Sequence, residues 1–367
     1  MSHFFFDKDN CLVSISNAIL YHYTGKSFHK PHPKMMEILG KNKYDKIVLM
    51  LFDGMGKSIQ DKYFTKSDFI YRKKAFEITS VFPPTTVAAT TAVCSGKFPL
   101  ETGWLGWRQY FKNHSVVVDM FTNNNSATNE KIPGPYLSSI YCDYQKIWEI
   151  LEENNIKAGC LYPYPIDQSG PKSLDEFFQV ADVLMKKEGP HFYYMYNAEP
   201  DHSIHDYGTD DERILHKVKE INRGVYNLAK NNKDNLIIVL ADHSLINTTF
   251  LNLKEHEDFY STLVTISSLD SRSAFFHVKE GKNAQFEELF KKYYGEYFLL
   301  LTKEEVIKQG WFGEGNPHPL FEEFVGEYMA TSISKYGVTF DDENTMIGAH
   351  SGSLEEESII NVAIINK

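Results

Sequence analysis

Five apolar runs of strand length recur along the chain, and none shows the alternation of apolar and polar residues that one wet face would produce. These runs are rich in Val, Ile, Leu and Tyr. Continuous runs of this kind are typical of parallel strands that are buried on both faces. The predicted strands span residues 46–52, 157–162, 191–197, 235–241 and 359–365.

Longer stretches with the helical spacing of apolar residues lie between these runs. We expect helices over residues 143–154, 173–187 and 210–231. The alternation of strand and helix predicts an α/β fold, a doubly wound and mostly parallel central sheet with helices on both faces. In such sheets, ligands bind beyond the carboxyl ends of the strands.

Two stretches interrupt the alternation of strand and helix. Residues 104–140 are rich in Asn, Ser, Gly and aromatic residues, and we expect them to pass over the ligand-binding edge. Residues 251–340 mix short strands with helices, which predicts a small inserted α+β cap. Because no Pro- or Gly-rich linker separates the two halves, residues 1–367 are expected to form a single catalytic domain that contains this cap.

Composition narrows the class of protein. The 367 residues carry a formal net charge of −11, and 42% of them are hydrophobic, so a sizeable core is expected. The acidic balance argues against stable nucleic-acid binding, which needs clustered Lys and Arg. It leaves an anionic substrate open, because bound cations would set the local field.

The N-terminal segment and the cysteines bear on location. The segment MSHFFFDKDNCLVS has an early acid and no basic region before a long apolar run, unlike a signal peptide. No apolar run is long enough to suggest a transmembrane helix. Scattered cysteines without a CxxC pair are typical of reduced thiols, so we expect a cytoplasmic protein with no membrane partner. These cysteines are Cys11, Cys94, Cys142 and Cys160.

Acids and histidines lie next to the predicted strands. Such side chains at the ends of buried strands are costly unless something compensates them, and two divalent cations would do so. The candidate metal ligands are Asp53, Asp201, His205, Asp242, His243 and His350.

The spacing of these residues favours shared sites. Asp201 and His205, at i and i+4, would lie on one face of a helical turn. Asp242 and His243 are contiguous at a strand end, where the turning chain lets both face one cavity. Asp and neutral His suit Zn²⁺ best, and the same set could hold Mn²⁺ or Fe. Each pair alone is more often a surface or loop feature, so the prediction depends on the ordered combination.

Several motifs together resemble those of the alkaline phosphatase superfamily, and within it those of the type I phosphodiesterase/nucleotide pyrophosphatase branch. They are FDGMG, FPPTTVAATTAVCSGKFPLETGWLGW, DHSIH, ADHS and GAHSGSLEEE, in the same order as in the family. The resemblance implies two metal sites, one held by Asp201, His205 and His350, the other by Asp53, Asp242 and His243 together with the nucleophile.

The resemblance also implies a threonine nucleophile ten residues before Gly96, which is Thr86. A Thr hydroxyl is a poor nucleophile until a metal lowers its pKa. Thr86 would start the helix of VAATTAV, bring backbone N–H groups towards the phosphoryl oxygens, and cap that helix as well. Thr85 is the neighbour most easily confused with it, and an N-cap role is the simpler interpretation of either residue alone.

The chain departs from the family pattern at two places. Trp107 stands where many members carry an Asn that contacts the phosphoryl group. Arg108 could supply a charge-assisted replacement and bind substrate, or it could be a surface residue beside a structural Trp. Tyr196 has the spacing of a residue that stacks on a nucleobase, or it could be a core strand residue. Val87 replaces the aromatic that often completes this base clamp.

We therefore predict a two-metal hydrolase of phosphodiesterase/nucleotide pyrophosphatase type, acting through Thr86 and a covalent phospho-enzyme intermediate. Its substrate is expected to be a small phosphodiester or nucleotide-like molecule, and the sequence does not set the oligomeric state. An alternative is a phosphonate or phosphomonoester hydrolase with the same metals. A non-catalytic, metal-stabilised binding protein is favoured only by the missing Asn.

Overall fold

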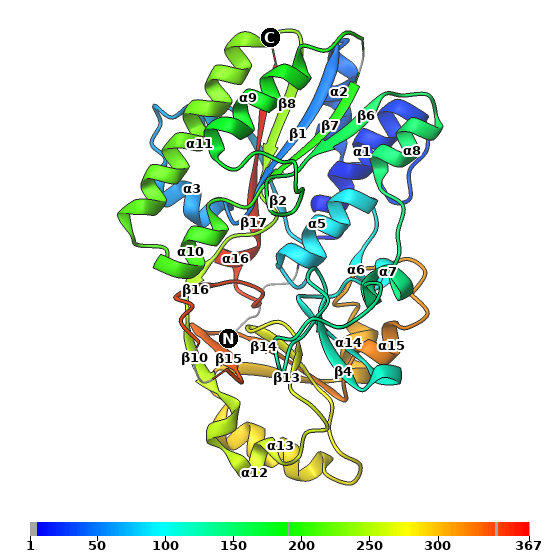
Figure 1. Ribbon diagram of the computed structural model, residues 1–367, viewed down its shortest axis with the longest axis vertical. Coiled ribbons are helices and arrows are strands. Elements are labelled where there is room, and N and C mark those ends of the chain that lie inside the picture. The colour runs from blue at the N-terminus through cyan, green and yellow to red at the C-terminus, as the bar shows by residue number, and fades with distance from the viewer. Residues whose placement is uncertain (1–5, 190, 342–343, 367) are drawn as a thin grey trace.

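The computed structural model describes residues 6–189, 191–341 and 344–366. A main sheet lies at one end of the molecule, and a second sheet with its own helices lies at the other (Figure 1). Within the described ranges, no helix is both long enough and apolar enough to cross a membrane.

The main sheet has six strands in the order β2-β17-β8-β1-β7-β6. β1 pairs in parallel with β7 and with β8, and β6 pairs in parallel with β7, so the predicted mostly parallel α/β sheet is confirmed. β17 runs antiparallel to both of its neighbours, β2 and β8. The strands are β1 (Lys46–Phe52), β2 (Lys74–Thr79), β6 (Ala158–Leu161), β7 (His191–Asn197), β8 (Leu236–Leu240) and β17 (Ile359–Ile365).

The expectation that the last apolar run is a parallel strand is wrong. β17 is buried at every position but its first, and a continuous apolar run reports burial on both faces without reporting strand direction. The chain re-enters the main sheet from the side of the second sheet, where the parallel strands end, so its last strand runs back through the sheet (Figure 1).

Helices cover both faces of the main sheet, as predicted (Figure 1). α9 packs against α11 on one face, while α1 packs against α2, α5 and α8 on the other. α8 begins later than expected because the Glu149 carboxylate accepts the backbone N–H of Lys146 at 2.9 Å and sets the first turn there. These helices are α1 (Leu12–Thr24), α2 (Pro33–Lys41), α5 (Thr86–Ser95), α8 (Ile147–Glu153), α9 (Leu174–Met185) and α11 (Glu212–Asn231).

The second sheet has seven strands in the order β13-β14-β12-β11-β3-β4-β5. It takes strands from both interrupting segments, so residues 251–340 form only part of it. Its helices bury an aromatic cluster that includes Phe259, Phe276, Phe286 and Phe290. The strands are β3 (Arg108–Phe111), β4 (Val116–Asp119), β5 (Asn124–Asn125), β11 (Ser268–Leu269), β12 (Ser273–Phe276), β13 (Phe298–Thr302) and β14 (Tyr328–Ser332), and the helices of this part include α12 (Glu257–Tyr260), α13 (Asn283–Tyr293) and α14 (Lys303–Gln309).

Two short strand pairs join the halves of the molecule. β9 (Ile246–Asn247) pairs with β16 (Gly348–Ala349), and β10 (Thr249–Asn252) pairs with β15 (Tyr336–Thr339). β9 closely follows β8 and β16 closely precedes β17, so the chain leaves and re-enters the main sheet through this ribbon.

Candidate active site

The candidate ligands converge at one edge of the main sheet. Asp53 directly follows β1, while Asp201 and Asp242 come soon after β7 and β8. β2 ends at the same edge and leads to Thr86. Because β17 is antiparallel, its amino end also lies here, and His350, which precedes it, joins the other ligands.

A first group consists of Asp201, His205 and His350, whose ligand atoms lie within 4.8 Å of one another. Asp201 and His205 lie on α10 (Asp201–Tyr207), with His205 Nε2 at 3.1 Å from Asp201 Oδ2. His205 Nδ1 lies 2.8 Å from the Gly348 carbonyl, and His350 Nδ1 lies 3.1 Å from the Pro84 carbonyl. These backbone contacts leave both Nε2 atoms facing Asp201.

A second group consists of Asp53, Asp201 and His243, again within 4.8 Å. His243 Nε2 lies 3.3 Å from Asp53 Oδ1 and 3.5 Å from Asp242 Oδ2. The other Asp242 oxygen, Oδ1, accepts the backbone N–H of Gly54 at 3.1 Å. The six predicted ligands are therefore together, and Asp201 lies between the two groups.

The chemistry of this donor set fits divalent cations. Burial, and then the charges of Asp242 and Asp201, raise the pKa of Asp53 well above its usual value. Burial and the charge of Asp201 raise the pKa of Asp242 to about 7. Asp201 Oδ1 and Asp242 Oδ2 are buried and have no hydrogen-bond partner in the described part of the chain. Cations would supply the missing partners and favour the ionised acids.

Two of the three candidate histidines, His243 and His350, match this interpretation. Burial lowers the pKa of His243 to about 4 and that of His350 to about 3, so both rings are neutral at pH 7, which is the form that binds metals. Burial also opposes charge on His205, but the carboxylate of Asp201 more than offsets it and raises the pKa of His205 to about 9. Neutral His and ionised Asp are the N and O donors that Zn²⁺ accepts.

The hydroxyls of Thr85 and Thr86 point in different directions. Thr86 Oγ1 lies 3.2 Å from His243 Nε2 and 3.4 Å from Asp53 Oδ1. Thr85 Oγ1 instead donates to Asp270 Oδ2 at 2.6 Å, and Thr85 is only 1% exposed. Of the two, only Thr86 presents its hydroxyl to the candidate ligands.

The expected capping role of Thr86 is wrong. α5 begins at Thr86, and Thr85 occupies the N-cap position. The Thr85 side chain accepts no hydrogen bond from a backbone N–H of the first turn. The two hydroxyls are engaged with the ligands and with Asp270 instead. The first N–H groups of α5 therefore have no side-chain cap, which favours an anion beside Thr86.

Tyr196 does not present its ring as a stacking surface. It is 6% exposed, and its hydroxyl donates to Asp53 Oδ2 at 2.5 Å. The spacing that suggested contact with a nucleobase instead places Tyr196 behind Asp53, where it orients that carboxylate. This burial and this hydrogen bond favour the core interpretation, and contact with the substrate stays a prediction.

Arg108 lies close to the residue that bonds to Thr85. It pairs across the sheet with Leu269, whose neighbour Asp270 holds Thr85. Its guanidinium carbon lies 4.7 Å from the centre of the Phe340 ring, and its buried Nε has no hydrogen-bond partner among the described residues. Trp107, the preceding residue, is 38% exposed.

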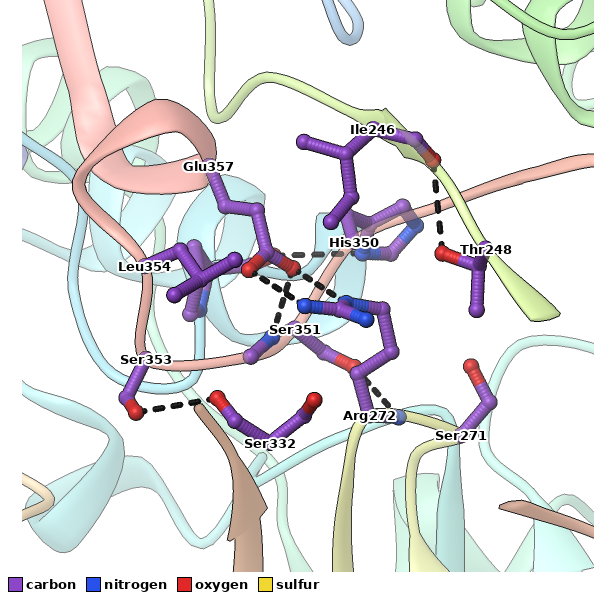
Figure 2. Close-up of polar contacts among 12 residues, drawn as sticks. Ile246, Thr248, Ser271, Arg272, Ser332, His350, Ser351, Ser353, Leu354 and Glu357 are labelled. Atoms are coloured by element: carbon purple, nitrogen blue, oxygen red, sulfur yellow. Dashed lines mark hydrogen bonds and ion pairs between the residues drawn. The ribbon is translucent and has the colours of Figure 1, made fainter. Parts of the chain in front are cut away.

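Sequence reasoning missed three residues of this region. Asp270 holds Thr85, and Arg272 and Glu357 form a buried ion pair close to His350 (Figure 2). Asp270 and Arg272 lie in the polar segment SSLDSRS, and Glu357 ends a run of acids. Each of these two segments has the composition of a solvated loop. No local pattern links segments so far apart in the chain.

Comparison with known proteins gives a family and a fold. A family model described as type I phosphodiesterase / nucleotide pyrophosphatase matches residues 47–353. Comparison with curated proteins finds no match.

Two similar solved structures come from mammals. Human ectonucleotide pyrophosphatase/phosphodiesterase 5 matches with a TM-score of 0.65 at 17% identity, over 88% of each chain. An inactive form of the murine protein, in complex with AMP, matches with a TM-score of 0.64 at 16% identity, over 87% of each chain. At this identity the likeness shows a shared fold.

Proposed function

This chain belongs to the type I phosphodiesterase/nucleotide pyrophosphatase family of phosphoric-ester hydrolases, and we propose that it cleaves small phosphodiesters or nucleotide-like pyrophosphates with Thr86 as the nucleophile. One observation carries this proposal. The Thr86 hydroxyl lies beside His243 and Asp53, where a bound cation would contact it too. A Thr hydroxyl needs such activation because its ordinary pKa makes it a weak nucleophile.

Two divalent ions complete the proposed site, most favourably Zn²⁺, with Mn²⁺ or Fe as alternatives. They would lower the pKa of the Thr86 hydroxyl and neutralise charge on the phosphoryl oxygens. The proposed ligands are Asp201, His205 and His350 for one ion, and Asp53, Asp242 and His243 for the other.

The proposed reaction has two displacements at phosphorus. Thr86 Oγ1, having lost its proton to solvent, attacks in line while the bond to the leaving oxygen breaks, and that oxygen departs with the electron pair. Water then attacks the phosphothreonine, the bond from phosphorus to Thr86 breaks, and Thr86 regains a proton. The uncapped N–H groups of α5 are available to the phosphoryl oxygens in both steps.

Arg108 is proposed to bind an anionic oxygen of the substrate. It belongs to the strand that pairs with Leu269, next to the residue that holds Thr85, and its Nε needs a partner. An arginine offers paired donors that match phosphate geometry. The AMP complex of the murine relative supports a nucleotide-like substrate for this fold.

The same arginine favours a second candidate, a phosphomonoester or phosphonate hydrolase. Monoesters carry one more charge on the transferred group than diesters, and the guanidinium of Arg108, whose Nε has no hydrogen-bond partner among the described residues, would stabilise that charge. Under either function, we propose that residues 251–340 and the β3–β5 segment form one cap on a single catalytic domain.

Substrate profiling separates these functions. The metal-loaded protein would be assayed with bis(p-nitrophenyl) phosphate, p-nitrophenyl phosphate and p-nitrophenyl phenylphosphonate, with the metal content measured on the same sample. We expect the highest kcat/KM for the diester. A preference for the monoester or the phosphonate would favour the second candidate, and full turnover after exhaustive demetallation would contradict both.

A further inference from the structure

Arg272 and Glu357 form an ion pair with no solvent exposure behind the candidate active site (Figure 2). Arg272 Nε donates to Glu357 Oε1 at 2.7 Å, and Nη2 donates to Oε2 at 2.9 Å. The guanidinium also donates to the Tyr336 and Ser334 carbonyls, each at 2.9 Å. A buried ion pair is weak evidence for stability, because apolar residues of similar volume often serve as well. Its contacts suggest another role.

Glu357 contacts two of the three segments that carry candidate histidine ligands. Its Oε1 also accepts the backbone N–H of Gly352 at 2.8 Å, two residues after His350. Its backbone carbonyl accepts the N–H of Ser244 at 2.8 Å, one residue after His243. One residue of α16 (Glu355–Ser358) therefore anchors the chain directly behind two ligands.

Arg272 lies in the turn between β11 and β12 of the second sheet and contacts the turn after His350 from the other side. Its backbone N–H donates to Ser351 Oγ at 3.2 Å, and the neighbouring Ser273 hydroxyl donates to the Ser351 carbonyl at 2.5 Å. Ser351 has a φ of 82°, which costs energy for any residue other than glycine and persists only where its surroundings enforce it. These contacts hold the turn in that conformation immediately after His350.

The orientation of His350 depends on this turn. With Nδ1 directed to the Pro84 carbonyl, Nε2 faces Asp201 Oδ1 at 3.9 Å. A small displacement of residues 351–353 would move Nε2 away from Asp201 and His205. Outer partners of metal ligands commonly change metal affinity by about 10- to 100-fold when they are removed.

We propose that Arg272 and Glu357 are positioning residues, through which the second sheet sets the orientation of His350 and so the affinity for the ion held by Asp201, His205 and His350. This inference rests on the proposed function for the existence of that ion. It adds that the second sheet determines the metal affinity of a site built on the main sheet.

Two variants of the full chain test the proposal. Glu357→Gln keeps the size of the side chain but replaces one carboxylate oxygen by an amide N–H₂ group. Whichever oxygen is replaced, the N–H₂ group cannot accept a hydrogen bond, so a contact with the Arg272 guanidinium or with the Gly352 N–H is lost. Arg272→Met/Glu357→Leu replaces the pair by apolar residues, which often restores stability without restoring these contacts. Stepwise Zn²⁺ dissociation constants would be measured by calorimetry with a competing chelator, and amide hydrogen exchange would be followed at residues 351–353.

We expect both variants to bind one Zn²⁺ about tenfold or more weakly, to keep the affinity for the other, and to exchange the 351–353 amides faster. Asn17→Ala is the matched control. Asn17 is fully buried and donates to the Val13 and Gly96 carbonyls on the far side of α5, so its loss lowers stability. It should leave both dissociation constants unchanged.

Wild-type Zn²⁺ affinities in folded Glu357→Gln would overturn the inference and leave the proposed function standing. An equal loss in the Asn17→Ala control would overturn it too, because the effect would then be general destabilisation. If the double variant does not fold, Glu357→Gln decides alone. Failure of the wild-type protein to bind ions at all would overturn both the inference and the proposed function.

Discussion

At the scale of single residues, two adjacent hydroxyls have different partners. Thr86 faces Asp53 and His243, whereas Thr85 donates to Asp270 and is buried. The divergence arises where the extended chain of the N-cap gives way to α5. It agrees with the proposed roles, catalytic for Thr86 and structural for Thr85, and substitution can separate the two.

Thr86→Ala should lose turnover by a factor on the order of 10³ or more, because the neighbouring hydroxyl of Thr85 is bonded to Asp270 and does not replace it. Its metal content and melting temperature should stay near those of wild type. Thr86→Ser is the matched control, since it keeps a hydroxyl and should retain part of the activity. Turnover numbers and metal analysis on the three proteins would check this.

Thr85→Ala should instead lower stability, by about 1–3 kcal/mol, because Asp270 would be left buried with one partner fewer. Its turnover should fall much less than that of Thr86→Ala. Urea denaturation and kcat measured together would check this. A dead Thr85→Ala protein with intact metals would mean that the loop was assigned one residue out of register.

Asp201 should behave differently from the other ligands, because its carboxylate lies within reach of both groups. His350→Ala should remove one ion and leave the other, whereas Asp201→Ala should weaken both. Asp201→Asn, which keeps the size but not the charge, is the control for packing. Metal content after dialysis at a fixed free Zn²⁺ concentration would check this, and the loss of a single ion from Asp201→Ala would contradict the shared position.

The sequence indicated the candidate ligands, which the structure brings together, but not the residues around them. Asp53, Asp242 and His243 could be found because each follows a recognisable strand. The roles of Tyr196 and Asp270 could not, because the direction of a side chain and its partner in a distant segment leave no mark on local periodicity. Tyr196 illustrates this. Its spacing placed it correctly beside the candidate ligands, but its hydroxyl donates a hydrogen bond to Asp53.

At the scale of elements, apolar runs set the positions of the main strands well. β1, β7 and β17 have the predicted bounds, and β6 and β8 are slightly shorter. Apolar runs do not predict strand direction, because a strand buried on both faces has the same continuous apolar sequence whether it is parallel or antiparallel. The antiparallel β17 matters for the site, since a parallel strand would have placed His350 at the opposite edge of the sheet.

The ribbon of β9 and β16 positions two candidate ligands, His205 and His350. Gly348 accepts from His205 through its carbonyl, and a Cβ at Gly348 would lie 2.6 Å from the Ile204 carbonyl oxygen. Gly348→Ala should therefore displace β16 from α10, cost about 1–3 kcal/mol of stability, and weaken the ion held by His205 and His350.

Gly40→Ala is the matched control for that substitution. Gly40 lies in α2, a Cβ there meets no atom within 4 Å, and alanine favours a helix over glycine. Gly40→Ala should raise stability by about 0.5–1 kcal/mol and leave metal binding unchanged. Wild-type Zn²⁺ affinity in Gly348→Ala would show that the ribbon does not set the ligand geometry.

At the scale of the whole molecule, the least predictable feature was the second sheet. It joins Arg108 of one segment to Leu269 of another, a pairing between residues far apart in the chain that no local pattern encodes. Residues 251–340 were predicted as an insertion, but the shared sheet needs both interrupting segments. The cytoplasmic location remains a prediction from the cysteines, all four of which are free, with Cys160 exposed.

Metal binding should control the stability of the whole fold. Asp53, Asp201 and Asp242 are buried together, and without cations their mutual repulsion opposes folding. Each ion that binds only the folded protein should stabilise it by about 2.7 kcal/mol at a hundred times its dissociation constant. Chelation should therefore lower the melting temperature by several degrees, as calorimetry with and without chelator would check.

Asp242→Asn should shift stability in opposite directions in the two states. Without metal, the substitution removes one of three mutually repelling buried acids, so the chelated variant should be more stable than chelated wild type, by about 0.5–2 kcal/mol. With Zn²⁺, the variant lacks a ligand charge, binds more weakly, and should be less stable than loaded wild type.

Ser138→Ala, at a buried polar position in another part of the fold, should change both states by the same amount. Calorimetry of the variant and wild type, each with Zn²⁺ and with chelator, gives all four values. A fall in stability of Asp242→Asn in both states would mean that Asp242 is a structural residue, held for its hydrogen bonds to Gly54 and His243 rather than for a cation.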